Sequence, residues 1–335
     1  MAGPVPEIAE LDPQDDAGLR EFHAVELAAY RADHPHAVLR TFPQLVQLVR
    51  RPSSYYRRTL LVARDADRMV GVAELGLTVE DNLHLADVRV EVMPEARRRG
   101  VGRALHEELA RRARAAGRTT WVGELNRPLE GAPSPSYRFA TALGYEVVQE
   151  EDHQLLHLPV DPARLDALGA VPGEYEVVTW TNRAPDEVVE AYAAMHTQMG
   201  RDAPSGAVDH QPVEITVERV RQGEQRTAEA YDQVVAAARR RGEGVLGGYT
   251  LVYLPHDADY VIQDDTLVMP VHRGHGLGMT LKATVLRILA EEHPQRRFVH
   301  TWNAVENTFM QRINRELGFR PVERELRVQR RDVDG

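Results

Sequence analysis

The sequence predicts an α/β fold with a mixed (α+β) sheet, arranged as two similar domains in tandem. The first observation is a turn in the order Arg-x-x-Gly-x-Gly at Arg97 to Gly102, which lies between a strand-like run and a helix-like run. The same order recurs in the same context at Arg273 to Gly278. A strand that passes through a glycine-rich turn into a helix is typical of α/β proteins.

A second landmark repeats at nearly the same separation. A Leu-Gly-aromatic triplet is centred on Gly144 and again on Gly318, and this separation matches that of Gly102 and Gly278 to within two positions. Two independent motifs at nearly one spacing indicate that a whole domain is duplicated. We therefore expect an N-terminal domain over residues 1–160, a linker over 161–173 and a C-terminal domain over 174–335.

Composition narrows the class of protein. With 335 residues, 43% of them hydrophobic, the chain is long enough for two cores, and its net charge of −10 argues against nucleic acid as a partner. The absence of cysteine excludes disulfides, thiolate metal sites and a cysteine nucleophile, and Lys282 is the only lysine. The first residues lack a secretion signal, and no uninterrupted apolar run approaches the length that a membrane-spanning helix needs. We therefore expect a cytoplasmic protein without a membrane partner.

The elements of the first copy follow from apolar periodicity and turn residues. Asp12 is expected to cap the first helix, with Pro13 in its first turn. In chain order we expect a strand at 4–11, this helix, a helix at 42–49, hairpin strands at 59–64 and 69–77, a strand at 83–93, the glycine-rich turn with its helix, a strand at 119–125, a short helix ending at 143, and closing strands at 146–149 and 154–158.

The same order of elements restarts after the linker. In chain order we expect a strand at 175–180, a helix at 184–195, a polar segment at 198–225, hairpin strands at 233–239 and 245–254, a strand at 260–269, the second glycine-rich turn with a helix to about 292, a strand at 298–302, a helix at 307–317, and a last strand or strand pair.

Each turn is a candidate anion site. The first N–H groups of a helix have no intrahelical partner, and glycine lets an anion approach them closely. Neither copy has the Gly-x-x-x-x-Gly-Lys-Ser/Thr order of nucleotide hydrolases, and Gly274, Gly276 and Gly278 have the wrong spacing for a dinucleotide-binding fingerprint. The turns therefore predict phosphate binding of another kind.

On these turns and the Leu-Gly-aromatic triplets, the sequence resembles the GNAT superfamily of N-acetyltransferases, and in particular its two-domain actinobacterial members such as mycothiol synthase. The resemblance covers residues 7–158 and 175–329. It implies that the fourth and fifth strands of each domain splay apart around acetyl-CoA, whose pyrophosphate lies on the turn while its pantetheine pairs with the strand edge. Acetyl-CoA is then a cosubstrate, and no metal is needed. The residues that this resemblance assigns to the coenzyme are Val92, Met93, Arg97, Arg98, Arg99, Gly100, Val101, Gly102, Arg103 and Ala104 in the first copy, and Val268, Met269, Arg273, Gly274, His275, Gly276, Leu277, Gly278, Met279, Asn303 and Asn307 in the second.

Transfer of an acetyl group to an amine needs a base, and the candidates precede each turn. Glu91 and Asp265 lie on these strands with the same parity relative to their turns, so we expect both to face the cleft, while Asp264 faces away. A solvated or hydrogen-bonded carboxylate is the alternative reading of each. His256 and His300 are further options for the base, and no group of histidines has the spacing of a metal site.

Both copies depart from the family at the general acid. The family's tyrosine, four residues before the glycine of the triplet, is Ala140 in one copy and Asn314 in the other, and Tyr137 is a possible substitute. The second copy retains Asn303 and Asn307, although Asn307 can equally be a helix N-cap. We therefore expect the C-terminal domain to be catalytic and the N-terminal domain to bind coenzyme A or to be structural.

The function expected from these features is acetyl-CoA-dependent acetylation of the primary amine of a small molecule. Acetylation of a peptide or protein amine and a non-catalytic protein that binds or senses acyl-CoA are the alternatives. The expected partner is the small-molecule acceptor, and the chain is expected to be a monomer or a homodimer.

Overall fold

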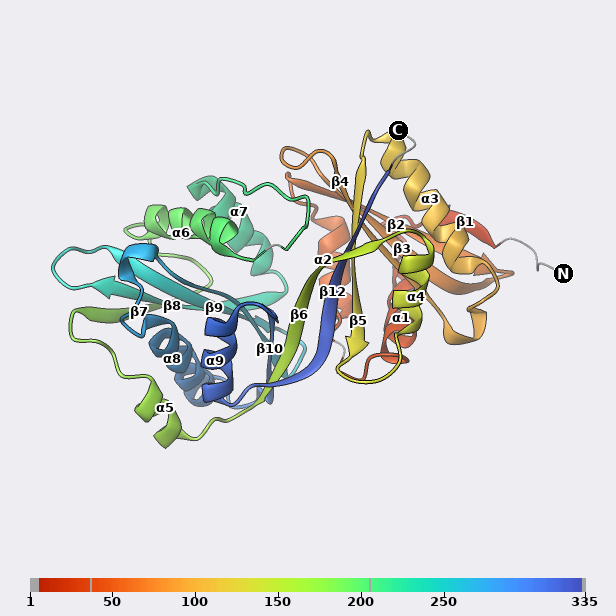
Figure 1. Ribbon diagram of the computed structural model, residues 1–335. Helices are drawn as coiled ribbons and strands as arrows, with labels where there is room; N and C mark the ends of the chain where they lie inside the picture. Colours follow the sequence, from red (N-terminus) through yellow and green to blue (C-terminus); the bar gives the residue numbers. More distant parts are fainter. Residues whose placement is uncertain (1–5, 37, 205, 333–335) are drawn as a thin grey trace. The chain divides into compact units, whose positions relative to one another are not determined.

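The structure is a computed structural model that describes residues 6–36, 38–204 and 206–332 (Figure 1). The chain divides into two compact units. The N-terminal unit comprises Met1–Glu150, Ser205–Gln211 and Glu323–Gly335, and the C-terminal unit comprises Glu151–Pro204 and Pro212–Val322. The α/β class and the mixed sheet are confirmed, because each unit contains both antiparallel and parallel strand pairs.

The sheet of the N-terminal unit has the strand order β1-β2-β3-β4-β5-β12. The strands are β1 (Glu7–Glu10), β2 (Tyr56–Asp65), β3 (Arg68–Thr78), β4 (Leu85–Val92), β5 (Thr120–Pro128) and β12 (Arg320–Arg331). β4 and β5 run parallel but pair only from Leu85 to Asp87 and from Thr120 to Val122, and they separate beyond these residues. The predicted splay is therefore present in the first unit.

Helices cover both faces of this sheet. α1 (Asp16–Arg31) and α2 (Phe42–Arg50) pack on one face around Leu19, Phe22 and Leu45. α3 (Val101–Ala115) and α4 (Pro135–Ala142) pack on the other face, with the short 3₁₀ helix η1 (Pro94–Ala96) before α3. We call these the α1 face and the α3 face. Alternate residues of β4 point to opposite faces, so Arg89 and Glu91 lie on the α1 face.

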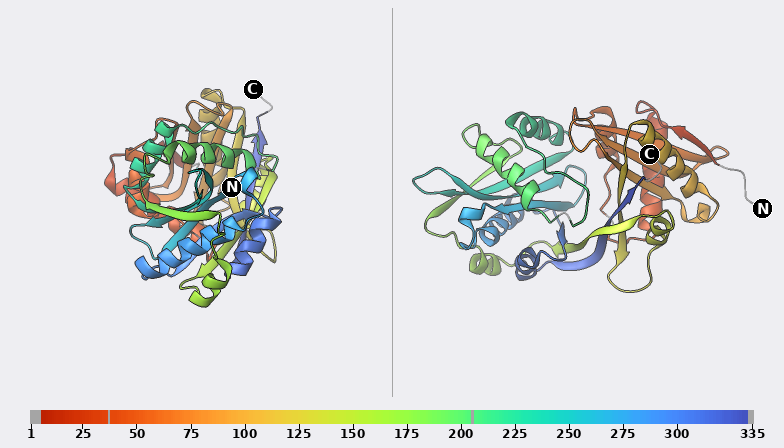
Figure 2. Two further views of the ribbon diagram at one scale, coloured as in Figure 1. Left: turned by 90° about the vertical axis from the view of Figure 1, so that its left-hand side faces the viewer. Right: turned by 45° about the horizontal axis from the view of Figure 1, so that its top comes forward.

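The sheet of the C-terminal unit has the order β6-β11-β10-β9-β8-β7. Its strands are β6 (Glu146–His157), β7 (Tyr175–Thr181), β8 (Tyr231–Arg240), β9 (Leu246–Pro255), β10 (Tyr260–Val268) and β11 (Phe298–Ala304). β10 and β11 pair only from Tyr260 to Ile262 and from Phe298 to His300, so the splay recurs. α6 (Val189–Asp202) and α7 (Val217–Thr227) cover one face, and α5 (Pro162–Leu168), α8 (Leu277–Glu292) and α9 (Thr308–Leu317) cover the other (Figure 2). η2 (Pro270–His272) precedes α8.

The last strand of each copy completes the other unit. β12 follows the second copy in sequence, yet its residues Glu323–Arg331 pair with β5 along Thr120–Pro128 (Figure 1, blue beside yellow). β6 follows the first copy, yet its residues 151–157 pair with β11. The units are thus not the contiguous segments 1–160 and 174–335 that we expected, because each splayed fifth strand takes its partner from the other half of the chain.

Several predicted elements differ in detail. The first helix is capped by Asp15 and not by Asp12, because the Asp15 side chain accepts from the Gly18 N–H. The two closing strands of the first copy form one strand, β6, and the last element is the single strand β12. The helix expected at 184–195 is α6, which extends into the polar segment, and that segment also contains α7. The linker contains α5, which packs on α8.

We expect Leu326→Ala to destabilise the N-terminal unit although the residue belongs to the last strand of the sequence. Leu326 is 1% exposed and packs in the core beneath α3, so the variant should lower the free energy of unfolding by about 2–5 kcal/mol. Hydrogen exchange followed by mass spectrometry checks this, because protection should fall in β5. An equal loss in β10 with none in β5 would contradict the observed pairing.

Candidate coenzyme and acetyl-transfer sites

Each glycine-rich turn has the backbone of an anion site. Two residues in each turn have left-handed conformations: Arg98 (φ 63°) and Gly100 (φ 89°) in the first, Gly274 (φ 88°) and Gly276 (φ 77°) in the second. Alternation of this kind turns successive N–H groups toward one point. At the first turn, the first hydrogen bond of the helix runs from the Ala104 N–H to the Gly100 carbonyl. The N–H groups of the residues just before Ala104 therefore point out of the end of the helix. The backbone of both turns is thus compatible with an anion, and pyrophosphate binding there stays a prediction.

The first arginine of each turn has an internal role. Arg97 donates from Nε to the Val92 carbonyl (3.0 Å) and pairs with Asp33 at 2.9 Å. Arg273 donates in the same way to the Val268 carbonyl (3.1 Å) and pairs with Asp202, which lies at the end of α6 as Asp33 lies just after α1. Each arginine thus ties its turn to the strand before it and to the end of a helix, α1 in the first unit and α6 in the second.

Gly102 and Gly278 have ordinary φ angles and serve close packing. A Cβ added to Gly102 would lie 3.3 Å from Phe139 Cζ, and one added to Gly278 would lie 3.3 Å from Ile313 Cδ1. These glycines let α4 and α9 approach the starts of α3 and α8. The last glycine of each motif therefore shapes the wall of the site, while the positive-φ residues shape the turn itself.

The strand residues assigned to the pantetheine divide into two kinds. The N–H groups of Met93 and Met269 donate to Val70 and Gly247 on the neighbouring strands, at 3.0 and 2.9 Å. By strand alternation, the backbone of Val92 and Val268 faces the open edge instead. An added strand could therefore pair with the N–H groups of the two valines, whose carbonyls already accept from the arginines.

The remaining assigned residues lie around the two helix starts. Arg98, Arg99, Arg103 and His275 line the outside of the turns, Val101 and Leu277 are buried anchors, and Ala104 and Met279 are half-buried. Asn307 is the N-cap of α9, since its side chain accepts from the Met310 N–H at 3.2 Å. Asn303 on β11 donates to Thr301 Oγ1 at 3.3 Å. Their contacts with the coenzyme stay a prediction.

Arg99 and His275 occupy matched, exposed positions in the two turns, so they offer matched tests. We expect Arg99→Glu and His275→Glu each to weaken one acyl-CoA binding event by about tenfold or more, because each places a carboxylate beside a pyrophosphate at a helix N-terminus. Isothermal titration of each variant with acetyl-CoA measures this. Unchanged affinity and stoichiometry in both variants would contradict the assignment of the turns.

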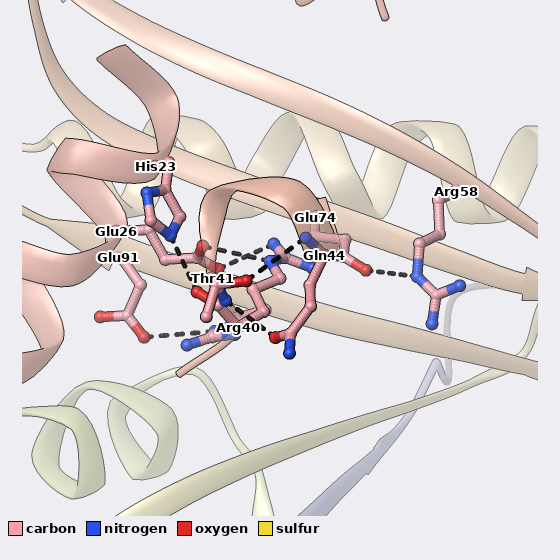
Figure 3. A network of polar contacts seen from close by, with 9 residues as sticks. His23, Glu26, Arg40, Thr41, Gln44, Arg58, Glu74 and Glu91 are labelled. Carbon is pink, nitrogen blue, oxygen red and sulfur yellow. Dashed lines mark hydrogen bonds and ion pairs between the residues drawn. The ribbon is translucent and has the colours of Figure 1, made fainter. Parts of the chain in front are cut away.

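A line of charged side chains with alternating sign crosses the α1 face of the N-terminal unit (Figure 3). Arg58 donates from Nε to Glu74 (2.7 Å), and the other oxygen of Glu74 lies 2.8 Å from Arg40. Arg40 binds Glu26, which is 1% exposed, at 2.7 and 3.1 Å. Burial would raise the pKa of Glu74, but the two guanidinium groups outweigh it and lower that pKa. The carboxylate of Glu74 is therefore held ionised.

This line ends at Glu91 on the splayed part of β4. Arg89 lies 3.1 Å from Glu26 and 3.5 Å from Glu91, so Glu91 shares its cation with a better placed carboxylate. Burial raises the pKa of Glu91, and Arg89 offsets this only in part. Glu91 lines a cleft between β4 and β5, together with Tyr30 and Asn126. A carboxyl group with a raised pKa in a cleft is suited to proton transfer.

The C-terminal unit places a different set of groups on its α6 face. Asp265 accepts a hydrogen bond from the Tyr249 hydroxyl at 2.7 Å, and that hydroxyl lies 3.1 Å from His196 Nδ1. Since the Tyr249 proton is directed to Asp265, the hydroxyl oxygen accepts from Nδ1–H of His196. In the neutral ring with this tautomer, Nε2 of His196 carries the lone pair. Sequence reasoning missed His196 and Tyr249, which come from α6 and β9 and have no motif.

The sheet irregularity explains why Asp265 lies here. The pairing of β10 with β9 shifts between Gln263 and Thr266, so Asp264 and Asp265 together form a bulge. The other histidine options lie elsewhere: His256 is 3.7 Å from Asp232, and His300 is hydrogen-bonded to His153 at 2.9 Å. Neither of these two histidines joins the group around Asp265.

The general-acid position differs between the units. Ala140 is buried beside the first cleft and has no proton to give. Asn314 is fully buried, and its Nδ2 donates to Gln154 at 2.8 Å, while its Oδ1 has no hydrogen-bond partner among the described residues. Tyr137 is half-buried on α4. A tyrosine proton donor is therefore lacking at both aligned positions.

Comparison with known proteins agrees with this architecture. Residues 19–132 match the profile of the Acetyltransferase (GNAT) family. A tandem GNAT protein from the clavulanic acid biosynthesis pathway, solved without AcCoA, is 28% identical, with a TM-score of 0.83 over 98% of this chain and 99% of that one. A GCN5-related N-acetyltransferase from Sphaerobacter thermophilus shares the fold at 16% identity, with a TM-score of 0.68 over 98% and 96% of the two chains. A search of curated proteins found no match.

These findings define the fold. With its two splayed sheets and two glycine-rich turns, it is the fold of a tandem GNAT protein. Residues 19–132 are similar to the GNAT acetyltransferase family, which uses acetyl-CoA as cosubstrate.

Within residues 6–36, 38–204 and 206–332, no group of three or more His, Asp or Glu side chains could hold a metal ion. No helix in the same described residues is both long and apolar enough to cross a bilayer.

Proposed function

We propose that the protein moves an acetyl group from acetyl-CoA to the primary amine of a small molecule, and that transfer takes place in the C-terminal unit. The observation that carries this proposal is the hydrogen-bonded relay His196–Tyr249–Asp265 on the splayed side of β10. An acceptor reaches the reaction as an ammonium ion and must lose a proton before it attacks. The relay supplies a base with an oriented tautomer for that proton.

The residues of the unit divide the work as follows. The turn from Arg273 to Gly278 holds the coenzyme pyrophosphate, and the Val268 N–H aligns the extended arm along the strand edge. His196 Nε2 takes the ammonium proton, while Tyr249 holds Nδ1 protonated and Asp265 stabilises the imidazolium that forms. Positioning of amine and thioester supplies much of the remaining rate. The departing thiolate takes a proton from water, since the aligned tyrosine is Asn314.

The N-terminal unit is proposed to bind coenzyme A without transferring its acyl group. Its turn has the same backbone conformations, which supports binding. One observation favours a second candidate, transfer in this unit: Glu91 combines a raised pKa with a place in the cleft. Glu91 is also the end of an internal ion network, which is the alternative explanation of its burial.

The acceptor class is proposed from charge. The chain carries a net charge of −10, which favours a cationic amine over an anionic one. An aminoglycoside-like or amino-acid-derived amine would suit this acidity. Release of coenzyme A thiol, followed with a disulfide dye across an amine panel, tests the proposal without protein background, because the chain has no cysteine. Binding of acetyl-CoA with no release for any small amine or peptide would favour the sensing alternative.

A further inference from the structure

Lys282 is a buried amine in an unexpected place. It is the only lysine among 41 lysine and arginine residues, and its side chain is 1% exposed. It lies on α8, four residues after Gly278, so about one helical turn separates it from the second anion-binding turn. Its Nζ is 5.4 Å from the centre of the Phe319 ring. Among the described residues, no carboxylate forms an ion pair with it.

A lysine here is more costly than the apolar residue that would fill the same space. An unpaired charge in an apolar environment is unfavourable, so burial lowers the pKa of Lys282 to about 7. Burial is the only cause of that shift, since no neighbouring charge contributes. Arginine cannot lose its proton in this way. The one position where the chain has lysine is thus one where the side chain can be a neutral amine, which is a nucleophile.

The repeat shows where this amine lies relative to the splayed strands. Lys282 occupies the position in the second copy that His106 occupies in the first, counted from the glycine-rich turns. Phe319 corresponds in the same way to Tyr145, counted from the two triplets. In the N-terminal unit His106 is hydrogen-bonded to Tyr145 at 3.0 Å, and both line the cleft between β4 and β5. The equivalent place in the C-terminal unit is the α8 side of the gap between β10 and β11. An acyl-CoA arm paired with the open edge of β10, as proposed above, would run along this wall.

We propose that Lys282 is a self-acylation site, modified by the acyl-CoA that binds the turn at the start of the same helix. The Nζ lone pair attacks the thioester carbonyl, the new N–C bond forms, and the C–S bond breaks. The amine proton passes to the departing thiolate, which leaves as coenzyme A thiol. This inference rests on the proposed function only in requiring acyl-CoA at the C-terminal turn.

The product is an amide, so the acyl group is not passed on. Acylation therefore marks the unit permanently and is not a step of turnover. It also replaces a titratable amine by a neutral amide. We expect the acylated protein to melt at a higher temperature than the unmodified protein at neutral pH.

Mass spectrometry of the full-length protein tests the proposal. After incubation with acetyl-CoA we expect the intact mass to rise by one acetyl group, and trypsin no longer to cut after Lys282. Lys282→Met and Lys282→Arg should lose the modification, and the first of these should remain folded because the site is apolar. Acetylation should be at least about tenfold faster than that of the N-terminal amine, whose pKa of about 8 makes it an internal reference for chemical acylation.

The turn variants separate site-directed from random acylation. His275→Glu should slow the modification of Lys282, whereas Arg99→Glu, the matched change in the other turn, should not. Equal rates in wild type and His275→Glu would overturn the proposal, as would an unmodified Lys282 when titration shows the C-terminal turn occupied. If the modification is absent but amine turnover is present, only this inference fails. If acetyl-CoA does not bind at all, the proposed function fails with it.

Discussion

Replacing Asp265 by asparagine is expected to lower kcat/KM for amine acetylation by about 10²–10⁴-fold, the range typical of general acid–base catalysis. Asparagine can still accept from Tyr249, so the local packing should persist, but it cannot stabilise an imidazolium at His196. The rate loss should shrink at high pH, where the acceptor amine is already neutral. A steady-state pH profile of coenzyme A release measures both effects.

Glu91→Gln is the matched control for this prediction, because Glu91 is the candidate base of the other unit. We expect it to leave kcat/KM within about twofold of wild type if transfer takes place in the C-terminal unit. The opposite pattern, with Glu91→Gln inactive and Asp265→Asn active, would place transfer in the N-terminal cleft. Tyr249→Phe provides an intermediate test, since it removes the hydroxyl that joins His196 to Asp265 and retains the ring.

The second large effect concerns stability and its dependence on pH. We expect the Lys282→Met variant to have a larger free energy of unfolding than wild type at pH 7, because methionine fills the site without an ionisable group. In wild type the folded pKa of Lys282 is about 7, whereas the ordinary value for an exposed lysine is 10.5. Between these values the unfolded chain binds a proton that the folded chain does not.

The sign of the pH effect follows from this difference. Stability of wild type should rise with pH above about 7, and relative to Lys282→Met the slope should be about 1.4 kcal/mol per pH unit. Below pH 7 both states are protonated, so the difference between the two proteins should level off at its largest value. Chemical denaturation of both proteins at several values between pH 6 and pH 9 checks this, because the other groups titrate equally in both. If the free energies of unfolding of the two proteins changed equally with pH, Lys282 would have an ordinary pKa.

Local signals account for the part of the site that the sequence predicted. A left-handed turn before a helix requires glycine at particular positions, so Gly100, Gly274 and Gly276 mark the turns by a steric rule that acts within a few residues. The duplicated spacing then places the same device twice. Strand and helix positions followed from apolar periodicity for the same reason, with errors mainly at ends such as the cap at Asp15.

Contacts between distant segments account for the rest. Glu91 was predicted from its place on the strand, but the ion network in which it ends joins α1, β3 and β4, and no local pattern links those segments. His196 meets Asp265 only because α6 packs over β9, where Tyr249 lies between them. A polar side chain on an amphipathic helix has the same sequence pattern whether or not it faces a carboxylate.

By itself, the sequence determined that the chain contains two copies of a strand–turn–helix device suited to a phosphate, and that one lysine lies a helical turn beyond the second copy. Only the tertiary structure decided that each splayed sheet is completed by a strand from the other half of the chain. The backbone of β12, which pairs with β5, is equally able to pair with β11 of its own copy. Backbone hydrogen bonds can join any two extended strand edges, so they do not by themselves specify which strand pairs with which. The partner is set by which side chains pack beneath the strand, and in the N-terminal unit Leu326 and Val328 pack into the core of α3.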